Sequence, residues 1–360
     1  MRYKPRMALP FLNSKAKKRD QIVAVDLGSR TTKAVYLQRK GDRYNLVRYA
    51  ILDAPIYERG PSVDILKDHL KSIMQALEAK TRHVTLSIGP NESILRNAEI
   101  PQMPVSEMRQ MLKFSTKTYL QQELPDYVFD CMIVAPRAPA VAVEGVKAPT
   151  KFKVWVGGAK NQLVDVIQNA VKGAGLIPDQ LLLSIVGPVN AFEVVEPEAF
   201  SKESVALVDI GFRSSTINIL SEGELLLSRV VGIGGDKLTT GLAESLGISY
   251  AEAEGIKVGM PSEVESSLIP LLSPLGREMR ASIDFFEHQA DKTISQVYVS
   301  GAAARSDFML QALQSELMVS CKAWNPATFL SLAMPAQQLG ELESVAPELT
   351  IALGAAAASI

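Results

Sequence analysis

Two stretches that lie far apart in the chain repeat one pattern of apolar runs and polar turns. In the first, apolar runs at 22–25 and 34–37 enclose the turn DLGSRTTK. In the second, runs at 205–208 and 217–220 enclose the turn DIGFRSST, and in both copies another turn and a third apolar run follow. Short β-branched and apolar runs between glycine-containing turns are typical of strands. Each stretch therefore predicts three strands joined by two turns.

The two turns share an order of residue types that suits a phosphate group. Each reads apolar, Asp, apolar, Gly, any residue, Arg and two hydroxyl residues. Glycine lets the backbone approach a ligand, and nearby N–H groups and hydroxyls can donate to phosphate oxygens. We expect Asp26 and Asp209 to face those phosphates. A carboxylate can lie near a phosphate when Mg²⁺ lies between the two groups, and the aspartates would hold that Mg²⁺ through water molecules. One Asp-x-Gly turn is typical of any hairpin, whereas two matched copies indicate that both grip one phosphate chain.

This pattern supplies the candidate ligand residues of both turns. In the first turn they are Asp26, Gly28, Ser29, Arg30, Thr31, Thr32 and Lys33. In the second they are Asp209, Gly211, Ser214 and Ser215. Arginines beside hairpin turns are usually solvated, so this alternative stays open for Arg30 and Arg213. Asp26 and Asp209 are the candidates for positioning a metal or a water, and the catalytic residues are otherwise unassigned.

Between the two copies, residues 92–178 read as an inserted α+β subdomain. Its apolar pattern changes from strand to helix and back, with proline and glycine at the boundaries. It predicts, in order, a strand at 93–100, a helix at 106–122 with Ser106 as its N-cap, a Pro/Ala-rich loop at 136–149, a strand at 152–157 and a helix at 161–173.

The composition is that of an ordinary globular protein of about two domains. Of the 360 residues 47% are hydrophobic and 21% charged, which excludes collagen-like, disulfide-scaffold and wholly disordered classes. The net charge of −1 gives no basic excess for binding nucleic acid. Two cysteines, Cys131 and Cys321, fit a reducing cytosol and are too few for a Cys-rich zinc cluster. The histidines lack metal-ligand spacing.

The first 19 residues carry seven Lys or Arg residues around a short apolar run at 7–12. That run is too short to span a bilayer, and no other stretch is apolar enough to predict a transmembrane helix. A flexible, solvated tail is one interpretation. The other is a basic arm in weak contact with anionic lipid or an acidic partner.

The duplicated turn resembles the two phosphate motifs of the actin-like ATPase superfamily. This resemblance implies an α/β fold in which two related halves close over ATP and Mg²⁺. Three further elements resemble that superfamily, although each alone is an ordinary helix start, helical charge pair or small-residue turn. They are the second phosphate loop at Gly234, Gly235, Asp236 and Lys237, the Glu254 and Lys257 pair that brackets ribose and adenine, and the adenosine motif at Gly301 and Ala302. The superfamily usually has glycine where Ala302 stands.

The resemblance also implies a division of the chain. We expect a basic flexible tail at 1–20, a first actin-like half at 21–91 and 179–205, the inserted subdomain at 92–178, a second half at 206–346, and a C-terminal helix at 347–360 that returns to the first half.

Three phrases narrow the resemblance to the PilM family of the type IV pilus inner-membrane platform. They lie at 98–104, 172–178 and 247–254, within a similarity that runs from 21 to 360. The family resemblance implies a cytoplasmic nucleotide-dependent adaptor, peripheral to the inner membrane, that binds the cytoplasmic N-terminal peptide of a PilN-type protein. Self-association stays open. FtsA-like division proteins rank second, because they normally end in an amphipathic membrane helix, whereas this chain ends AAAASI.

Enzymatic turnover is expected to be slow or negligible. PilM-like sequences usually carry a glutamate after an aromatic residue in the inserted helix, and the corresponding pair here is Phe114-Ser115, in which serine cannot act as a base. Gln121, Gln122 or Glu123 could substitute, or be solvated residues of a helix end. A small-molecule kinase would need an aspartate base for its acceptor, and the insertion shows no such signature. The third alternative is a scaffold that has lost nucleotide binding. The intact motifs argue against it.

Overall fold

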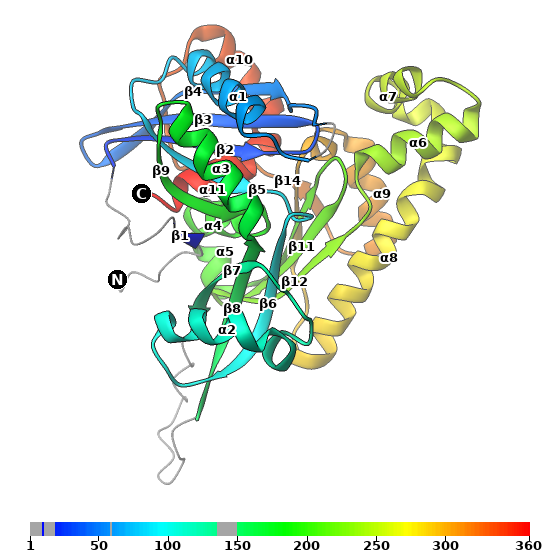
Figure 1. Ribbon diagram of the computed structural model, residues 1–360. Coiled ribbons are helices and arrows are strands. Elements are labelled where there is room, and N and C mark those ends of the chain that lie inside the picture. The colour runs from blue at the N-terminus through cyan, green and yellow to red at the C-terminus, as the bar shows by residue number, and fades with distance from the viewer. Residues whose placement is uncertain (1–8, 11–18, 58–59, 135–149) are drawn as a thin grey trace.

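The computed structural model describes residues 9–10, 19–57, 60–134 and 150–360 (Figure 1). Most of the predicted basic tail and the loop at 136–149 therefore lie outside the described residues. Within them the chain forms sheets of seven, five and three strands. The three strands predicted around each of the two turns are present, and the fold is α/β.

The first sheet contains the first copy of the duplicated pattern. Its strands are β1 (Leu9–Pro10), β2 (Gln21–Leu27), β3 (Thr31–Lys40), β4 (Arg43–Asp53), β5 (His83–Ile88), β9 (Ile177–Leu183) and β15 (Ser331–Leu332), in the order β1-β9-β5-β2-β3-β4-β15. β2, β5 and β9 are parallel, while β2, β3 and β4 form an antiparallel meander.

The second sheet repeats this arrangement. Its strands are β10 (Ser204–Ile210), β11 (Ser215–Ser221), β12 (Glu224–Val231), β13 (Gln296–Ser300) and β14 (Cys321–Ala323), in the order β12-β11-β10-β13-β14. β10, β11 and β12 again form a meander, and β10, β13 and β14 are parallel. The sequence repeat is therefore a repeat of topology, in which β2 corresponds to β10 and β5 to β13.

Helices cover the outer faces of both sheets. On the first sheet these are α1 (Val63–Ala76) and α3 (Asn161–Gly173), and on the second they are α8 (Glu265–Ala290) and α9 (Asp307–Leu317). α1 buries Leu66, Leu70 and Ile73, the spacing of one helix face. α6 (Gly235–Leu246) and α7 (Tyr250–Gly259) pack near the start of α8 and project from the body of the molecule (Figure 1).

Two further helices meet between the sheets. α4 (Gly187–Val195) follows β9, is extended by α5 (Pro197–Lys202), and packs against the second sheet through Phe192, which contacts Tyr298 edge to face at 4.6 Å. α11 (Thr350–Ala357) packs on the first sheet beside α10 (Ala336–Val345). Gly187 and Gly354 lie where α4 and α11 cross. Small residues let these two backbones approach closely.

The third sheet forms a lobe of its own at the lower end of the view in Figure 1. Its order is β6 (Ser93–Pro101), β8 (Lys151–Lys160) and β7 (Tyr127–Ile133), and α2 (Val105–Leu120) packs on it. The indole of Trp155 donates to the Leu225 carbonyl at 3.0 Å, which joins this lobe to β12. The Ser106 cap was predicted wrongly: α2 begins at Val105 after Pro104, since proline needs no N–H partner at a helix start.

Parts of the chain cross the boundaries expected from the sequence. α3 lies in the predicted insertion, yet it packs beside α1 on the first sheet. β15, within the predicted second half, pairs with β4 of the first sheet. Arg19, in the predicted tail, forms an ion pair with Asp179 at 2.6 Å. Among the helices that the structure describes, none combines the length and the apolar character needed to cross a membrane.

Candidate functional site

The two duplicated turns, one from each sheet, lie next to each other. Each follows the carboxyl end of a central strand, the first after β2 and the second after β10. The Arg30 guanidinium of the first turn lies 5.1 Å from the centre of the Phe212 ring in the second. This distance is typical of a cation–π contact. Residues far apart in sequence thus form one site.

Both aspartates point toward the centre of the molecule. Side chains alternate along a strand, so Asp26 projects from the same face as Ala24, which packs with α11. By the same rule Asp209 shares the face of Leu207, which packs with Phe192 of α4. Asp26 is 4% exposed and Asp209 is 8% exposed, so both residues are buried.

Burial dominates the electrostatics of the two carboxylates. It raises the pKa of Asp26 to about 6, with a smaller increase from Asp209, and Lys33 opposes the shift. It also raises the pKa of Asp209, against the effects of a hydrogen bond from Ser300 and of the Lys33 charge. The Ser300 hydroxyl donates to Oδ1 of Asp209 at 2.9 Å. Holding two negative charges here is costly, so the site favours a cation.

Glycine is required where the turns fold most tightly. A methyl group on Gly211 would lie 2.8 Å from the Ser214 carbonyl oxygen, and one on Gly28 would overlap the Thr31 carbonyl. Lys33 Nζ also approaches Gly28, lying 3.4 Å from the position of such a methyl group. Gly301 has a φ of +86°, a conformation that L side chains rarely adopt, and it abuts the Ile210 backbone.

The start of α6 is joined to the second turn. The amides of Gly235 and Asp236 donate to the carbonyls of Gly211 and Phe212, each at 2.9 Å. Gly234, the N-cap of α6, packs so closely on this turn that a side chain would overlap its backbone. These contacts bring the predicted second phosphate loop beside the second turn.

The predicted Glu254 and Lys257 pair forms a network with α6. Lys257 Nζ donates to Glu254 Oε2 at 2.7 Å, to the Thr239 hydroxyl at 2.6 Å and to the Gly235 carbonyl at 3.3 Å. Thr239 also donates to Glu254. Burial alone would raise the pKa of Glu254, but the hydrogen bonds from Lys257 and Thr239 outweigh it, and the pKa is lowered. The carboxylate is therefore held in its charged form.

Some of the predicted hydroxyls already have protein partners. Thr32 Oγ1 pairs with His69 Nε2 at 2.8 Å, and Ser215 donates to the Ile233 carbonyl at 2.6 Å. In contrast, the residues at the tips of the predicted motifs are exposed; they are Ser29, Arg30, Lys237 and Ala302. Thr32 and Ser215 thus stabilise the turns, whereas exposed residues are accessible to a ligand.

Sequence reasoning missed Ser300. It is the last residue of β13 and directly precedes the predicted adenosine motif at Gly301. Its register partner across the parallel strands is Asp209. The contact of Ser300 with Asp209 depends on β13 lying beside β10, and only the order of strands in the sheet reveals that position.

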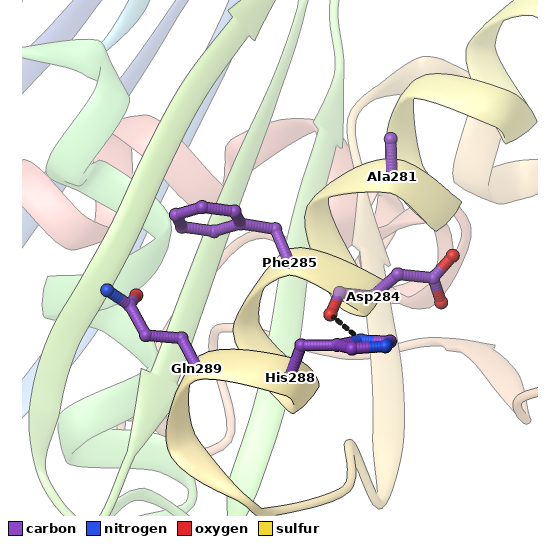
Figure 2. A pocket seen from close by; sticks show the side chains of 5 residues that line it. All are labelled: Ala281, Asp284, Phe285, His288 and Gln289. Carbon is purple, nitrogen blue, oxygen red and sulfur yellow. Dashed lines mark hydrogen bonds between the residues drawn. The ribbon is translucent and has the colours of Figure 1, made fainter.

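A concave surface lies away from the duplicated turns, on the long helix α8. It is a shallow, open groove of about 500 Å³ along one helix face (Figure 2). Phe285, which is 58% exposed, and His288 line it, and His288 Nδ1 lies 2.8 Å from the carbonyl oxygen of Asp284. None of its lining residues comes from the duplicated turns, so this groove is not the candidate site.

Comparison with known proteins identifies the fold. Residues 24–360 match the family model described as type IV pilus assembly protein PilM. The chain is similar to the structure of a PilM-PilN type IV pilus biogenesis complex, with a TM-score of 0.79 and 21% identity over 96% of this chain and 100% of that one. EutJ, the ethanolamine utilization protein of Carboxydothermus hydrogenoformans, gives a TM-score of 0.56 and 16% identity over 95% and 91%.

Two further proteins are less similar to this chain. MreB5 of Spiroplasma citri, solved with bound AMPPNP, gives a TM-score of 0.50 and 10% identity over 94% of this chain and 95% of that one. The cell division protein FtsA of Bacillus subtilis is 23% identical over 65% of this chain. The match spans only 57% of that FtsA. The chain has the actin-like ATPase fold that the duplicated turn predicts.

Proposed function

The chain belongs to the PilM family of type IV pilus assembly proteins, and we propose that it is a nucleotide-binding adaptor of the pilus assembly platform. Its ligands would be Mg²⁺-ATP, bound between the duplicated turns, and a short cytoplasmic peptide of a PilN-type membrane protein. The observation that carries the nucleotide half of the proposal is that Asp26 and Asp209, which come from separate sheets, are both buried and lie near enough for the charge of Asp209 to raise the pKa of Asp26. The family membership and the similar PilM-PilN complex support the other half.

The residues of the turns fit a metal-bound nucleotide. Burial raises the pKa values of the two carboxylates, and a divalent cation near both of them would lower the free-energy cost of keeping them ionised. The bound cation would offset phosphate charge. Asp26 and Asp209 would orient its water ligands, while Lys33 and the backbone amides of the turns would donate to phosphate oxygens. The solved complex of MreB5 with AMPPNP supports the ligand class.

The adenosine half of the ligand would lie toward α6, α7 and the end of β13. Glu254 and Lys257 are already linked at 2.7 Å, so one charged pair can offer an acceptor and a donor to a ribose. Gly301, whose φ of +86° and close approach to the Ile210 backbone leave no room for a side chain, forms the sharp turn at the end of β13. Ala302 beside it is small and exposed.

Hydrolysis is proposed to be slow. The inserted helix carries Ser115 where a carboxylate would be expected, and Ser115 has non-helical dihedral angles (φ −133°, ψ 28°) within α2. Glu123, the alternative carboxylate, is paired with Lys117 at 2.9 Å. Ser115 therefore offers no carboxylate base. We therefore expect nucleotide occupancy, more than turnover, to change the protein's interactions.

The proposed place of action is the cytoplasmic side of the inner membrane. A PilN-type partner would hold the chain there, because its cytoplasmic peptide belongs to a membrane-anchored protein. An FtsA-like division role is the second candidate, favoured by the 23% identity to the Bacillus subtilis protein. The two roles differ in the partner peptide that binds.

Calorimetric titration of the purified protein tests this proposal. One titration uses Mg²⁺-ATP, and another uses a synthetic peptide of a PilN-type cytoplasmic N-terminus, with a scrambled peptide of equal charge as the control. Saturable binding of ATP and of the native peptide alone supports the adaptor. Failure of Mg²⁺-ATP to bind overturns the nucleotide assignment, and equal binding of the scrambled peptide overturns the partner assignment.

A further inference from the structure

Each duplicated aspartate has a serine beside it on the neighbouring parallel strand. Ser87 of β5 is in register with Asp26 of β2. Ser300 of β13 is in register with Asp209 of β10. In-register residues of adjacent strands project from the same face of a sheet. Since β5 corresponds to β13 in the repeat, Ser87 and Ser300 hold equivalent positions.

The two serine hydroxyls differ in their partners. Ser300 Oγ donates to Asp209 Oδ1 at 2.9 Å and so fixes that carboxylate directly. Ser87 is 1% exposed, and its Oγ has no hydrogen-bond partner among the residues that the structure describes. Leaving a buried hydroxyl unpaired costs free energy, so an unpaired group in a native fold asks for an explanation.

The surroundings of Ser87 are polar and lie at the nucleotide end of the sheet. Asp26 is flanked on its other side by Lys33, its register partner on β3. A second buried hydroxyl without a partner among the described residues, that of Ser184, follows β9 at the same edge. Burial raises the pKa of Asp26 to about 6, so this carboxylate gains from added donors.

We propose that Ser87 is a positioning residue of the nucleotide site, which orders, together with Asp26, a water molecule in the hydration shell of the nucleotide-bound cation. The inference rests on the proposed binding of Mg²⁺-ATP. The serine hydroxyl would accept from or donate to that water, and the Asp26 carboxylate would accept from it. The two halves therefore differ: Ser300 fixes Asp209 through a direct hydrogen bond, whereas Asp26 and Ser87 both bind one water molecule.

Ser87→Ala tests the proposal, with Ser87→Thr as the conservative variant. Thr85→Val is the matched control: Thr85 lies two residues earlier on β5, is 2% exposed and pairs with Ser359 at 3.3 Å. For each variant, calorimetry gives the Kd of ATP with Mg²⁺ and with EDTA. We expect Ser87→Ala to weaken Mg²⁺-ATP binding about tenfold, in line with one lost hydrogen bond to a charged centre. Binding without the cation should stay unchanged, and Ser87→Thr should restore the affinity.

Thermal unfolding without nucleotide gives an independent readout. Removing an unpaired hydroxyl should leave Tm unchanged or raise it slightly in Ser87→Ala, whereas Ser300→Ala should lower it by several degrees because Asp209 loses its donor. If wild type binds Mg²⁺-ATP and Ser87→Ala binds it as tightly, the proposal for Ser87 is overturned and the nucleotide site stands. An equal loss of affinity with and without Mg²⁺, or a Tm loss as large as that of Ser300→Ala, also overturns it. If wild type fails to bind Mg²⁺-ATP, the proposed function falls, and this inference with it.

Discussion

At the scale of single residues, Asp26 is where folding stability and ligand binding oppose each other. Burial raises its pKa from 3.8 to about 6, more than Lys33 lowers it. The folded protein therefore binds a proton more tightly than the unfolded chain does. Above pH 6 the ionised carboxylate costs stability, and this cost disappears as the pH falls through 6 toward 4.

Asp26→Asn should accordingly be more stable than wild type at pH 8. A shift of about two pKa units corresponds to about 3 kcal/mol, which sets the upper limit of the gain. The gain should vanish near pH 4, and the variant should bind Mg²⁺-ATP more weakly than wild type at pH 8, with the difference narrowing below about pH 6 as Asp26 of wild type is protonated. Urea unfolding without nucleotide at pH 4 and pH 8, together with calorimetry, measures both effects. A variant less stable than wild type at pH 8 would show that burying the ionised carboxylate costs the folded protein nothing.

The same opposition predicts how wild type responds to pH. Protonation of Asp26 removes the charge that orients the cation, so Mg²⁺-ATP affinity should fall as the pH drops through about 6. ATP binding measured with EDTA should change less over this range. An affinity for Mg²⁺-ATP that stays constant between pH 5 and pH 8 would show that Asp26 does not face the cation.

Residues within one motif were predictable, and their partners from other strands were not. The turn carrying Asp26 and Gly28 is contiguous in sequence, so its chemistry could be inferred from residue order alone. Ser87 reaches Asp26 only through the pairing of β5 with β2. Likewise Thr32, predicted as a phosphate ligand, pairs with His69 on a helix that comes later in the chain. Such pairings depend on tertiary packing.

At the scale of elements, the crossing of α4 and α11 holds the centre of the molecule. Gly354 of α11 lies against the backbone of Gly187, and a methyl group there would overlap that backbone. α11 also packs on β2, the strand that ends at Asp26. The crossing of α4 and α11 thus supports the strand that leads into the first of the two turns.

Gly354→Ala should destabilise the protein by about 1–3 kcal/mol, because two backbones must separate to admit the methyl group. Gly340→Ala is the matched control. Gly340 lies in α10 with open space around the added methyl group, so this variant should gain about 0.5–1 kcal/mol from its helical propensity. Urea unfolding compares the two. Equal stabilities would mean that the helices can shift apart freely.

Local pattern was a good guide to elements and a poor guide to their neighbours. The predicted helix at 161–173 is exact, because amphipathic periodicity and the following glycine mark both ends. The sequence assigned it to the insertion, whereas it packs beside α1 on the first sheet. An apolar stripe shows that one face of a helix is buried against another element. It does not show which of the sheets that element belongs to.

At the scale of the whole molecule, the repeat predicted two related sheets and the structure adds how they meet. α4 carries Phe192 from the first topological unit onto Tyr298 of the second sheet. At the other end, Arg30 and Phe212 join the two turns. The contact near the crossing is buried and the contact between the turns is open. A ligand between the turns would therefore act where the halves are less tightly packed than at the contact of Phe192 with Tyr298.

This arrangement makes Phe212 the residue through which we expect nucleotide binding to affect the partner peptide. If Mg²⁺-ATP changes peptide affinity by some factor, the peptide must change Mg²⁺-ATP affinity by the same factor. We expect a factor of at least about five in wild type, the lower end of common couplings. Phe212→Ala removes the face on which Arg30 rests, so the factor should fall toward one. Phe285→Ala, an exposed phenylalanine on α8, is the control and should keep the wild-type factor.

Titrating each ligand in the presence and absence of the other measures that factor twice. Agreement of the two values verifies that one equilibrium is being observed, since reciprocity is a thermodynamic requirement. A factor of one in wild type, with both ligands bound, would make the protein an adaptor that ignores its nucleotide. A wild-type factor retained in Phe212→Ala would show that the contact of Arg30 with Phe212 does not carry the coupling. Measuring the factor in Gly354→Ala, in which the backbones of α4 and α11 must separate to admit the methyl group, would then test whether their crossing carries the coupling.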